Sequence, residues 1–237
     1  MKNTFRFKQF TVDQSNCGMK INTDGVLLGA LAEAGSTKSI LDIGTGTGVI
    51  ALMLAQRFPS AVIEAVEIDQ HAAQTATENF FNSPFADRLS CYYSSFEAFY
   101  TEFTGKKFDL ILSNPPFFLN SLKNPDAKKQ VARHTDADFF QKLLLLSAEK
   151  LSEEGSIWLI LPVDTLASIR HYASECGLVP ERIIHIRSFT DSKPHRSIVS
   201  LSKQTKTIVT SDFIIYKDKN AYSDQYRQTL KDFFIIF

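Results

Sequence analysis

Short apolar runs alternate with longer stretches of helical periodicity through the first two thirds of the chain. Residues 39–43 form a continuous apolar run that ends in glycines, which is typical of a buried strand. Residues 49–57 then repeat apolar positions at helical spacing and stop before a proline. The same alternation predicts further strands at 61–68, 89–93, 108–113 and 156–161, and helices at 70–81, 138–150 and 163–176.

Strands that alternate with helices predict βαβ units and a parallel sheet with helices on both faces. The last third of the chain differs, because it is rich in β-forming residues with no long helix between the runs at 182–189, 197–201 and 207–216. We expect those runs to be antiparallel strands. The predicted fold is therefore a Rossmann-like α/β domain with a mostly parallel seven-stranded sheet, an antiparallel C-terminal edge and a last helix within 224–237.

Residues 1–38 precede the first predicted strand and are more than a tail. The stretch 19–29 has an apolar helical pattern, and Thr23 or Asp24 is a candidate cap for that helix. No repeat, low-complexity tract or linker interrupts the chain. We therefore expect a single domain over 1–237, with 1–38 as an extension on the substrate side.

The charge balance narrows the range of partners. The chain has 26 Lys and Arg against 26 Asp and Glu, so a nucleic-acid partner would have to be held by a local basic patch. Cys17, Cys91 and Cys176 lie far apart without metal-ligand spacing, which predicts reduced structural thiols and no metal site. The N-terminus lacks the apolar run of a signal peptide, and runs such as 143–146 are too short to span a bilayer, so we expect a cytoplasmic protein with no membrane partner.

A glycine-rich loop joins the first predicted parallel strand to its helix. It reads Asp42-Ile43-Gly44-Thr45-Gly46-Thr47-Gly48, and glycines allow a backbone to turn sharply and approach a ligand closely. A tight turn without a ligand is the alternative interpretation. An acid, Glu67, ends the next strand, where a carboxylate can accept hydrogen bonds from ribose hydroxyls.

The acid at the start of the loop separates two classes of cofactor. Dinucleotide-binding loops read G-x-G-x-x-G and bind a pyrophosphate, which Asp42 would repel. S-adenosylmethionine carries a sulfonium and an α-amino group, so the charge of Asp42 favours it over NAD.

With these features the chain resembles the class I methyltransferases. The resemblance implies that Asp42 and the loop hold the methionine half of the cofactor, that Glu67 holds the ribose, and that Ile68 packs on the adenine. Many relatives have an aspartate after the third strand, where this chain has Ser94 and Ser95. The residues that the resemblance assigns to S-adenosylmethionine so far are Asp42, Gly44, Thr45, Gly46, Gly48, Glu67, Ile68 and Ser95.

A tetrapeptide with candidate chemistry, Asn114-Pro115-Pro116-Phe117, follows the predicted strand at 108–113. The amine of adenine or of an amide is a poor nucleophile, because its lone pair is delocalised. The side-chain oxygen of Asn114 and the backbone carbonyl of Pro115 can accept both amine hydrogens and direct the lone pair at a methyl group. The prolines hold that carbonyl rigidly, and Phe117 offers a stacking face to a flat substrate. An ordinary strand exit is the alternative.

The tetrapeptide resembles the motif of amino-methyltransferases that act on adenine, cytosine or glutamine amides. This resemblance assigns catalysis to Asn114, Pro115, Pro116 and Phe117, and places Asn114 also beside the cofactor. It does not name the substrate.

The N-terminal block is more discriminating. Phe7-Lys8-Gln9-Phe10 and the stretch from Met19 to Gly29 resemble the opening of the tRNA1(Val) (adenine(37)-N6)-methyltransferase family, and the likeness continues to Lys193-Pro194-His195-Arg196. It implies methylation of the N6 amine of an adenosine beside the anticodon of tRNA1(Val), release of S-adenosylhomocysteine, and a monomer. It also suggests that Lys20, Thr23 and Asp24 close over the methionine carboxylate.

An RNA substrate needs stacking and cationic side chains near the tetrapeptide. Bases in single-stranded RNA loops are splayed out and stacked on aromatics, and phosphates attract Lys and Arg. We expect residues 119–134 to form a loop that orders on RNA. The candidate RNA contacts are Phe10, Phe118, Lys128, Lys129, Arg133, Lys193 and Arg196.

Four other functions remain open at this point. A protein glutamine N5-methyltransferase shares the tetrapeptide but typically has Tyr in its last place and a separate helical N-terminal domain. A DNA adenine methyltransferase would need a target-recognition domain, which we do not find. A non-catalytic module that binds S-adenosylmethionine or RNA would not need the tetrapeptide, and a dehydrogenase does not suit the loop pattern.

Overall fold

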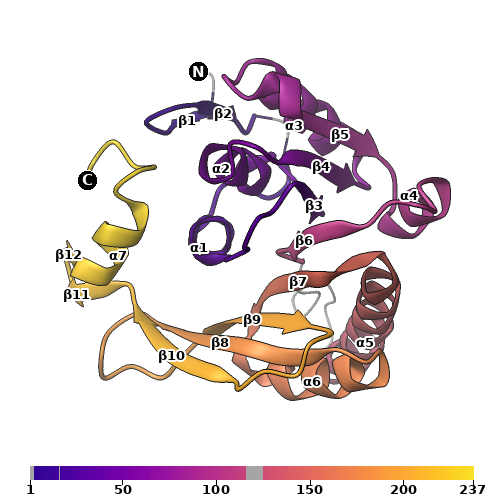
Figure 1. Cartoon of the computed structure of the whole chain (residues 1–237). Coiled ribbons are helices and arrows are strands. Elements are labelled where there is room, and N and C mark those ends of the chain that lie inside the picture. The colour runs from indigo at the N-terminus through magenta and orange to yellow at the C-terminus, as the bar shows by residue number, and fades with distance from the viewer. Residues whose placement is uncertain (1–2, 16, 116–124) are drawn as a thin grey trace.

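The computed structural model describes residues 3–15, 17–115 and 125–237, and for 125–136 the backbone only. Its centre is an eight-stranded sheet with the strand order β10-β8-β9-β7-β6-β3-β4-β5 (Figure 1). The strands are β3 (Ser39–Ile43), β4 (Val62–Glu67), β5 (Leu89–Tyr93), β6 (Phe108–Ser113), β7 (Leu151–Pro162), β8 (Val179–Arg187), β9 (Arg196–Ser202) and β10 (Val209–Ile214).

All strands of this sheet except β9 run in one direction. β3 pairs in parallel with β4 and β6, and β10 pairs in parallel with β8. β9 is antiparallel to both of its neighbours, β7 and β8. The predicted α/β class with a mostly parallel sheet is confirmed. The expected count of seven strands and the antiparallel edge were wrong, because β9 returns from a short turn after β8 and inserts beside β7, which leaves β10 as the edge strand.

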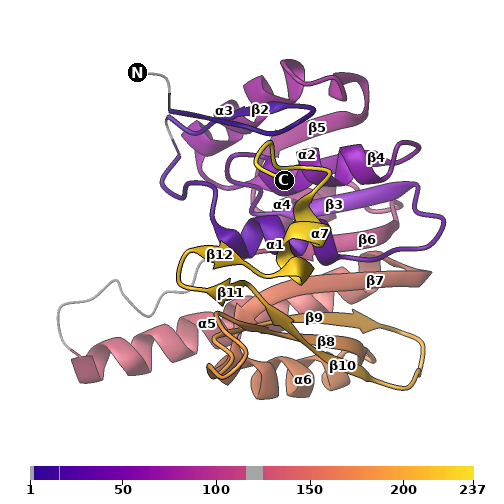
Figure 2. The same ribbon diagram turned by 90° about the vertical axis from the view of Figure 1, so that its left-hand side faces the viewer.

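Helices cover both faces of the sheet (Figures 1 and 2). One apolar core packs α1, α2, α3 and the C-terminal α7 against the sheet, and the other packs α4, α5 and α6. The helices are α1 (Thr23–Leu31), α2 (Val49–Arg57), α3 (Gln70–Phe81), α4 (Phe96–Glu102), α5 (Pro125–Lys150), α6 (Leu166–Glu175) and α7 (Asp224–Leu230), with 3₁₀ turns η1 (Ala86–Arg88) and η3 (Val163–Thr165). Over the described residues, none of these helices is long and apolar enough to cross a membrane.

The element bounds agree with the sequence pattern in the glycine-loop half of the chain. β3, α2, α3, β5 and β6 begin and end where the pattern predicted. The expected loop at 119–134 was wrong for its second half, because α5 already begins at Pro125. Proline at the first helical position, followed by Asp126, is a helix-start signal that the leucine-rich stretch further on obscured. The last predicted helix is shorter than expected, since α7 ends at Leu230.

The N-terminal hairpin, β1 (Thr4–Arg6) and β2 (Thr11–Asp13), packs against the C-terminal end of the chain. Lys8 Nζ donates hydrogen bonds to the carbonyl oxygens of Lys231 and Phe237. Phe10 is 5% exposed, and its ring stacks on that of Phe7 with centroids 4.5 Å apart. The expectation that Phe10 contacts RNA was therefore wrong, because its ring belongs to the core.

Gly48 precedes α2 in a conformation that favours glycine. Its φ is +80°, and a Cβ at this position would lie 2.5 Å from Cε1 of Phe80. We expect Gly48→Ala to lower the free energy of unfolding by about 2–4 kcal/mol, from left-handed strain plus overpacking. Urea denaturation measures the loss, with Gly35→Ala as the control, because a Cβ there meets no atom within 4 Å. Equal effects of the two substitutions would contradict this explanation.

Candidate active site

A cavity of about 500 Å³ opens at the carboxyl ends of β3, β4 and β6. The strand order reverses between β3 and β6, and open α/β sheets bind ligands at such a switch point. A volume of this size suits a nucleoside-sized ligand. The lining comes from residues 17–22, 43–47, 66–69, 94–97 and 113–115, with Gly25, Val49, Ile50 and Phe139.

The glycine loop forms the floor of the cavity. Gly44 and Gly46 have φ values of +71° and +57°, and a Cβ at either position would meet no atom within 4 Å. The backbone amides of Gly44 and Thr45 donate to the carbonyl of Val66, at 2.9 and 3.2 Å, which fastens the loop to the end of β4. Both glycines line the cavity, so the backbone here is accessible to a ligand. Gly48 does not line the cavity and serves the helix start instead.

Glu67 joins the end of β4 to the glycine loop. Its Oε2 accepts a hydrogen bond from the amide of Gly46 at 2.8 Å, and its Oε1 accepts one from the amide of Asp69 at 2.9 Å. The side chain is only 9% exposed and lines the cavity. Each carboxylate oxygen can accept more than one hydrogen bond, so Glu67 can still receive two hydroxyl donors from a ligand.

Asp42 lies in β3, directly before the glycine loop, and does not line the cavity. It is fully buried, and its Oδ2 accepts a hydrogen bond from the Thr45 hydroxyl at 2.6 Å, while Oδ1 has no hydrogen-bond partner among the residues that the structure describes. Burial raises the pKa of Asp42 to about 7, with a smaller contribution from Glu67, although the Thr45 hydroxyl and the Ala51 amide act in the opposite direction. Asp42 is therefore only partly ionised at pH 7, although a cation bound nearby would favour its ionised form, and it is not placed in the cavity wall.

Asp42→Asn is expected to stabilise the protein more at pH 8 than at pH 5. The carboxyl ionises near pH 4 in the unfolded chain and near 7 in the folded one, so its penalty grows between these values and is complete above pH 7. An asparagine does not ionise and avoids the penalty. Thermal unfolding at both pH values measures the difference, and Asp87→Asn on the surface controls for the loss of one negative charge. An equal change in Tm at both pH values would contradict the prediction.

Asn114 and Pro115 form the wall of the cavity at the end of β6. The hydroxyl of Ser113 donates to the carbonyl of Ile43 at 2.9 Å, which fixes the end of β6 against β3. The side-chain nitrogen Nδ2 of Asn114 lies near Gly25 of α1, because a Cβ added at Gly25 would be 3.5 Å from it. Two of the four predicted catalytic residues thus lie beside the glycine loop, whereas Pro116, Phe117 and the neighbouring Phe118 fall outside the described residues.

The first turn of α1 is held by contacts that the sequence pattern did not predict. The helix cap is Asn22, whose Oδ1 accepts a hydrogen bond from the amide of Gly25 at 2.9 Å, so the expected cap at Thr23 or Asp24 was wrong. Asp24 instead pairs with Arg196, whose Nε lies 2.7 Å from its Oδ2. Asp24 does not line the cavity, and Arg196 stays partly exposed in this pair, so the cofactor contact of Asp24 and the RNA contact of Arg196 stay predictions. Thr23 does not line the cavity.

The Asp24–Arg196 pair is expected to stabilise the first turn of α1 beside Asn114. Both side chains are partly exposed, so we expect a coupling free energy of about 1 kcal/mol. The measurement is a double-mutant cycle with Asp24→Asn, Arg196→Met and the double variant, followed by urea denaturation. Additive single effects would show that the two side chains do not interact.

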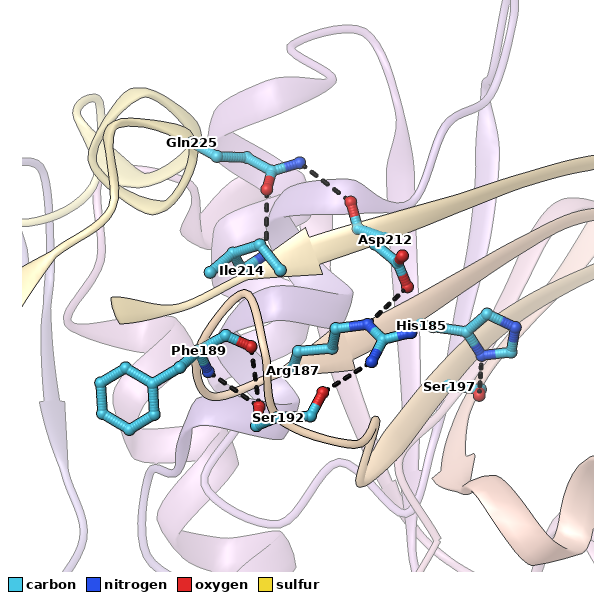
Figure 3. A network of polar contacts seen from close by, with 8 residues as sticks. All are labelled: His185, Arg187, Phe189, Ser192, Ser197, Asp212, Ile214 and Gln225. Carbon is cyan, nitrogen blue, oxygen red and sulfur yellow. Dashed lines mark hydrogen bonds and ion pairs between the residues drawn. The ribbon is translucent and has the colours of Figure 1, made fainter. Parts of the chain in front are cut away.

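The remaining candidate RNA contacts lie on two elements. Lys193 is exposed on the turn between β8 and β9, at the same edge of the sheet as the cavity. Figure 3 shows how Arg187 holds this turn: its Nη1 donates to the carbonyl of Ser192 at 2.6 Å, and its Nε to Oδ1 of Asp212 at 2.9 Å. Lys128, Lys129 and Arg133 lie on α5, and their side chains are outside the described residues.

Other wall residues were either placed as expected or missed. Lys20, Ile68 and Ser95 line the cavity as predicted, with Ile68 71% exposed and Ser95 also capping α4. The sequence pattern did not single out residues 17–19, Asn22, Glu97 and Phe139, which also line the cavity. Asn22 carried a signal, since it stands three positions before an amide that needs a cap. In the sequence, Phe139 looks like one more apolar residue of its helix.

Within the described part of the chain, no group of three or more His, Cys, Asp and Glu side chains could hold a metal ion.

Comparison with known proteins assigns this architecture to a family. The family model described as the methyltransferase small domain matches residues 22–165. The chain is 51% identical over 237 residues, all of both chains, to a protein of Pedobacter heparinus named tRNA1(Val) (adenine(37)-N6)-methyltransferase. A protein of Parabacteroides distasonis with the same name is 42% identical over 232 residues, which is 98% of this chain and 97% of the relative.

Solved structures agree on the fold. A predicted O-methyltransferase from Agrobacterium tumefaciens superposes with a TM-score of 0.68 at 18% identity, over 89% of this chain and 96% of that one. A methyltransferase from Pyrococcus furiosus gives 0.57 at 21% identity, over 82% and 90% of the two chains. At such identities the likeness shows a common fold.

Proposed function

The chain belongs to the tRNA1(Val) (adenine(37)-N6)-methyltransferase family, and from this premise we propose that it methylates the N6 amine of adenosine 37, beside the anticodon of tRNA1(Val), using S-adenosylmethionine. The observation that carries the proposal is the position of Asn114 and Pro115 in the wall of the cavity that the glycine loop and Glu67 complete.

The cavity fits the cofactor in shape and charge. The exposed backbone of Gly44 and Gly46 suits the methionine half, and the buried charge of Asp42 favours its cationic groups. Glu67 retains lone pairs for the two ribose hydroxyls. Ile68 offers an exposed apolar side chain for the adenine to pack on, and Ser95 lines the same cavity. Lys20 is the cation that the wall offers to the methionine carboxylate.

The chemistry of this chain's residues is the orientation of a weak nucleophile. When bound, the cofactor supplies an activated methyl group on a sulfonium. Oδ1 of Asn114 and the carbonyl oxygen of Pro115 accept the two amine hydrogens, and the adenine nitrogen then directs its lone pair at the methyl carbon. The transfer would leave S-adenosylhomocysteine and one proton, which the nitrogen would lose to solvent. Phe117, next to these residues in sequence, is proposed to stack on the adenine.

We propose that tRNA is held by local cations, because the chain has no net positive charge. Lys193 is exposed on a turn at the same edge of the sheet as the cavity, and Lys128, Lys129 and Arg133 follow the tetrapeptide on α5. Phe118 is a second proposed stacking residue. An adenosine in the anticodon loop needs less unstacking than a paired base to reach Asn114. We further propose that the protein acts as a monomer in the cytoplasm, with 1–38 as a cap on a single domain.

The test is methyl transfer to RNA. The protein is incubated with labelled S-adenosylmethionine and total tRNA from a strain that lacks the gene, and the tRNA is digested to nucleosides. We expect label in N6-methyladenosine and in one tRNA species. Absence of label in RNA would refute the proposed substrate, and label in a protein glutamine would favour the glutamine methyltransferase instead.

A further inference from the structure

Asn79 of α3 links two walls of the cavity without lining it. The residue is 4% exposed, and its side chain makes three hydrogen bonds to backbone groups. Oδ1 accepts from the amide of Asp13 at 2.8 Å, and Nδ2 donates to the carbonyls of Asp13 at 2.8 Å and Thr47 at 2.9 Å. One side chain thus ties the end of β2 to the glycine loop through backbone groups of both segments.

Each of the two anchored segments leads directly to the cavity. Thr47 is a wall residue of the glycine loop, next in the chain to Gly46. Asp13 ends β2, and residues 17–22, a few positions further along the chain, form another part of the cavity wall. The side chain of Gln14 accepts a hydrogen bond from the amide of Ile21 at 3.0 Å, so the wall segment is fastened to the residue that follows Asp13. The position of the wall therefore depends on where Asp13 is held.

We propose that Asn79 is a positioning residue for cofactor binding, which sets the distance between the glycine loop and the wall formed by residues 17–22. The carboxamide is suited to this role because it accepts one hydrogen bond and donates two. The inference rests on the proposed cofactor site. It adds a residue that does not touch the cofactor and acts by holding the backbone of two segments that line the site.

Loss of the carboxamide would act on binding more than on chemistry. The backbone groups of Asp13 and Thr47 would lose their hydrogen bonds to Asn79. The distance between the glycine loop and residues 17–22 would then vary more. The free protein would then have to order its wall on binding, which weakens affinity. Once the site is saturated, Asn114 and Pro115 are unchanged. We therefore expect a raised KM for S-adenosylmethionine with kcat nearly preserved.

The experiment compares two substitutions of Asn79 with two controls. Asn79→Ala removes all three hydrogen bonds, and Asn79→Asp keeps the shape and the acceptor for the Asp13 amide but loses both donated bonds. Asn82→Ala, on the exposed end of the same helix, removes a side chain that donates only to Glu78. Leu178→Ala creates a cavity in the other core and controls for a general loss of stability.

Calorimetric titration with S-adenosylhomocysteine gives Kd, thermal unfolding gives Tm, and steady-state kinetics give KM and kcat. We expect both Asn79 variants to raise Kd about tenfold, and Asn82→Ala and Leu178→Ala to leave it within about twofold, although Leu178→Ala lowers Tm. If Asn79→Ala does not fold, Asn79→Asp gives the result.

Two results would overturn the inference while the wild type binds normally: an unchanged Kd in the Asn79 variants, or an equal rise in Kd for Leu178→Ala. A wild-type protein that does not bind S-adenosylhomocysteine would instead overturn the cofactor site itself. The two failures are therefore distinguishable.

Discussion

Asn114→Ala is expected to lower kcat for methyl transfer by on the order of 10²–10³-fold, because it removes one of two acceptors for the amine hydrogens. The amide oxygen is the only part of Asn114 proposed to act on the nucleophile, and alanine cannot replace it. Single-turnover transfer to tRNA at saturating S-adenosylmethionine measures the loss. Saturation separates the chemical step from cofactor binding.

The controls for Asn114 separate chemistry from structure. Asn114→Asp keeps an acceptor oxygen and is expected to retain more activity than Asn114→Ala. Calorimetric titration with S-adenosylhomocysteine is expected to give a Kd within a few-fold of the wild type for both variants, since the glycine loop and Glu67 are intact. An equal loss of binding and transfer in Asn114→Ala would mean that the residue is structural.

The parts of the site that were predictable depend on local sequence. The glycine loop, Glu67 and the end of β6 each lie within a few residues of a strand terminus, and parallel strands bring their carboxyl ends to one edge. Once a parallel sheet was expected, these residues had to lie near one another. The structure places Gly44, Glu67 and Asn114 around one cavity, in agreement with that argument.

The parts that were missed depend on pairing between distant segments. Asp24 and Arg196 are 172 positions apart, and their pairing was not predicted. The sequence suggested a cofactor contact for Asp24 and an RNA contact for Arg196. Phe10 read as an exposed aromatic because its partners, Phe7 and Phe85, meet it only after the N-terminal hairpin has folded over the core. Periodicity finds a strand but does not say which strand lies beside it.

Sheet order shows the same limit. The runs that became β8, β9 and β10 were recognised as strands, and the absence of a long helix between them correctly suggested an antiparallel pair, β8 with β9. What followed β9 was a second reversal, which made β10 parallel to β8 at the edge. Nothing in the six residues between β9 and β10 distinguishes a return beside β9 from a crossing to β8.

Glu67→Ala is expected to raise the Kd for S-adenosylmethionine on the order of 100-fold, or about 2.7 kcal/mol. The substitution removes the acceptor for the amides of Gly46 and Asp69, which loosens the glycine loop, and it removes the proposed acceptor for two ribose hydroxyls. Glu67→Gln keeps one acceptor oxygen but places its side-chain NH2 group, a donor, against one of the two backbone amides. We therefore expect a loss of affinity smaller than that of Glu67→Ala. Calorimetric titration with S-adenosylhomocysteine measures both.

The matched control is Glu64→Gln on the same strand. Glu64 is also buried, but it lies an odd number of positions from Glu67 and so points to the opposite face of the sheet, where it pairs with Lys106 and accepts a hydrogen bond from the Tyr92 hydroxyl at 3.2 Å. It is expected to lower Tm without changing the Kd. If Glu64→Gln weakens binding as much as Glu67→Ala does, both substitutions act by destabilising β4, and the assignment of Glu67 to the ribose fails. If only the Glu67 variants weaken it, the carboxylate acts at the cavity itself.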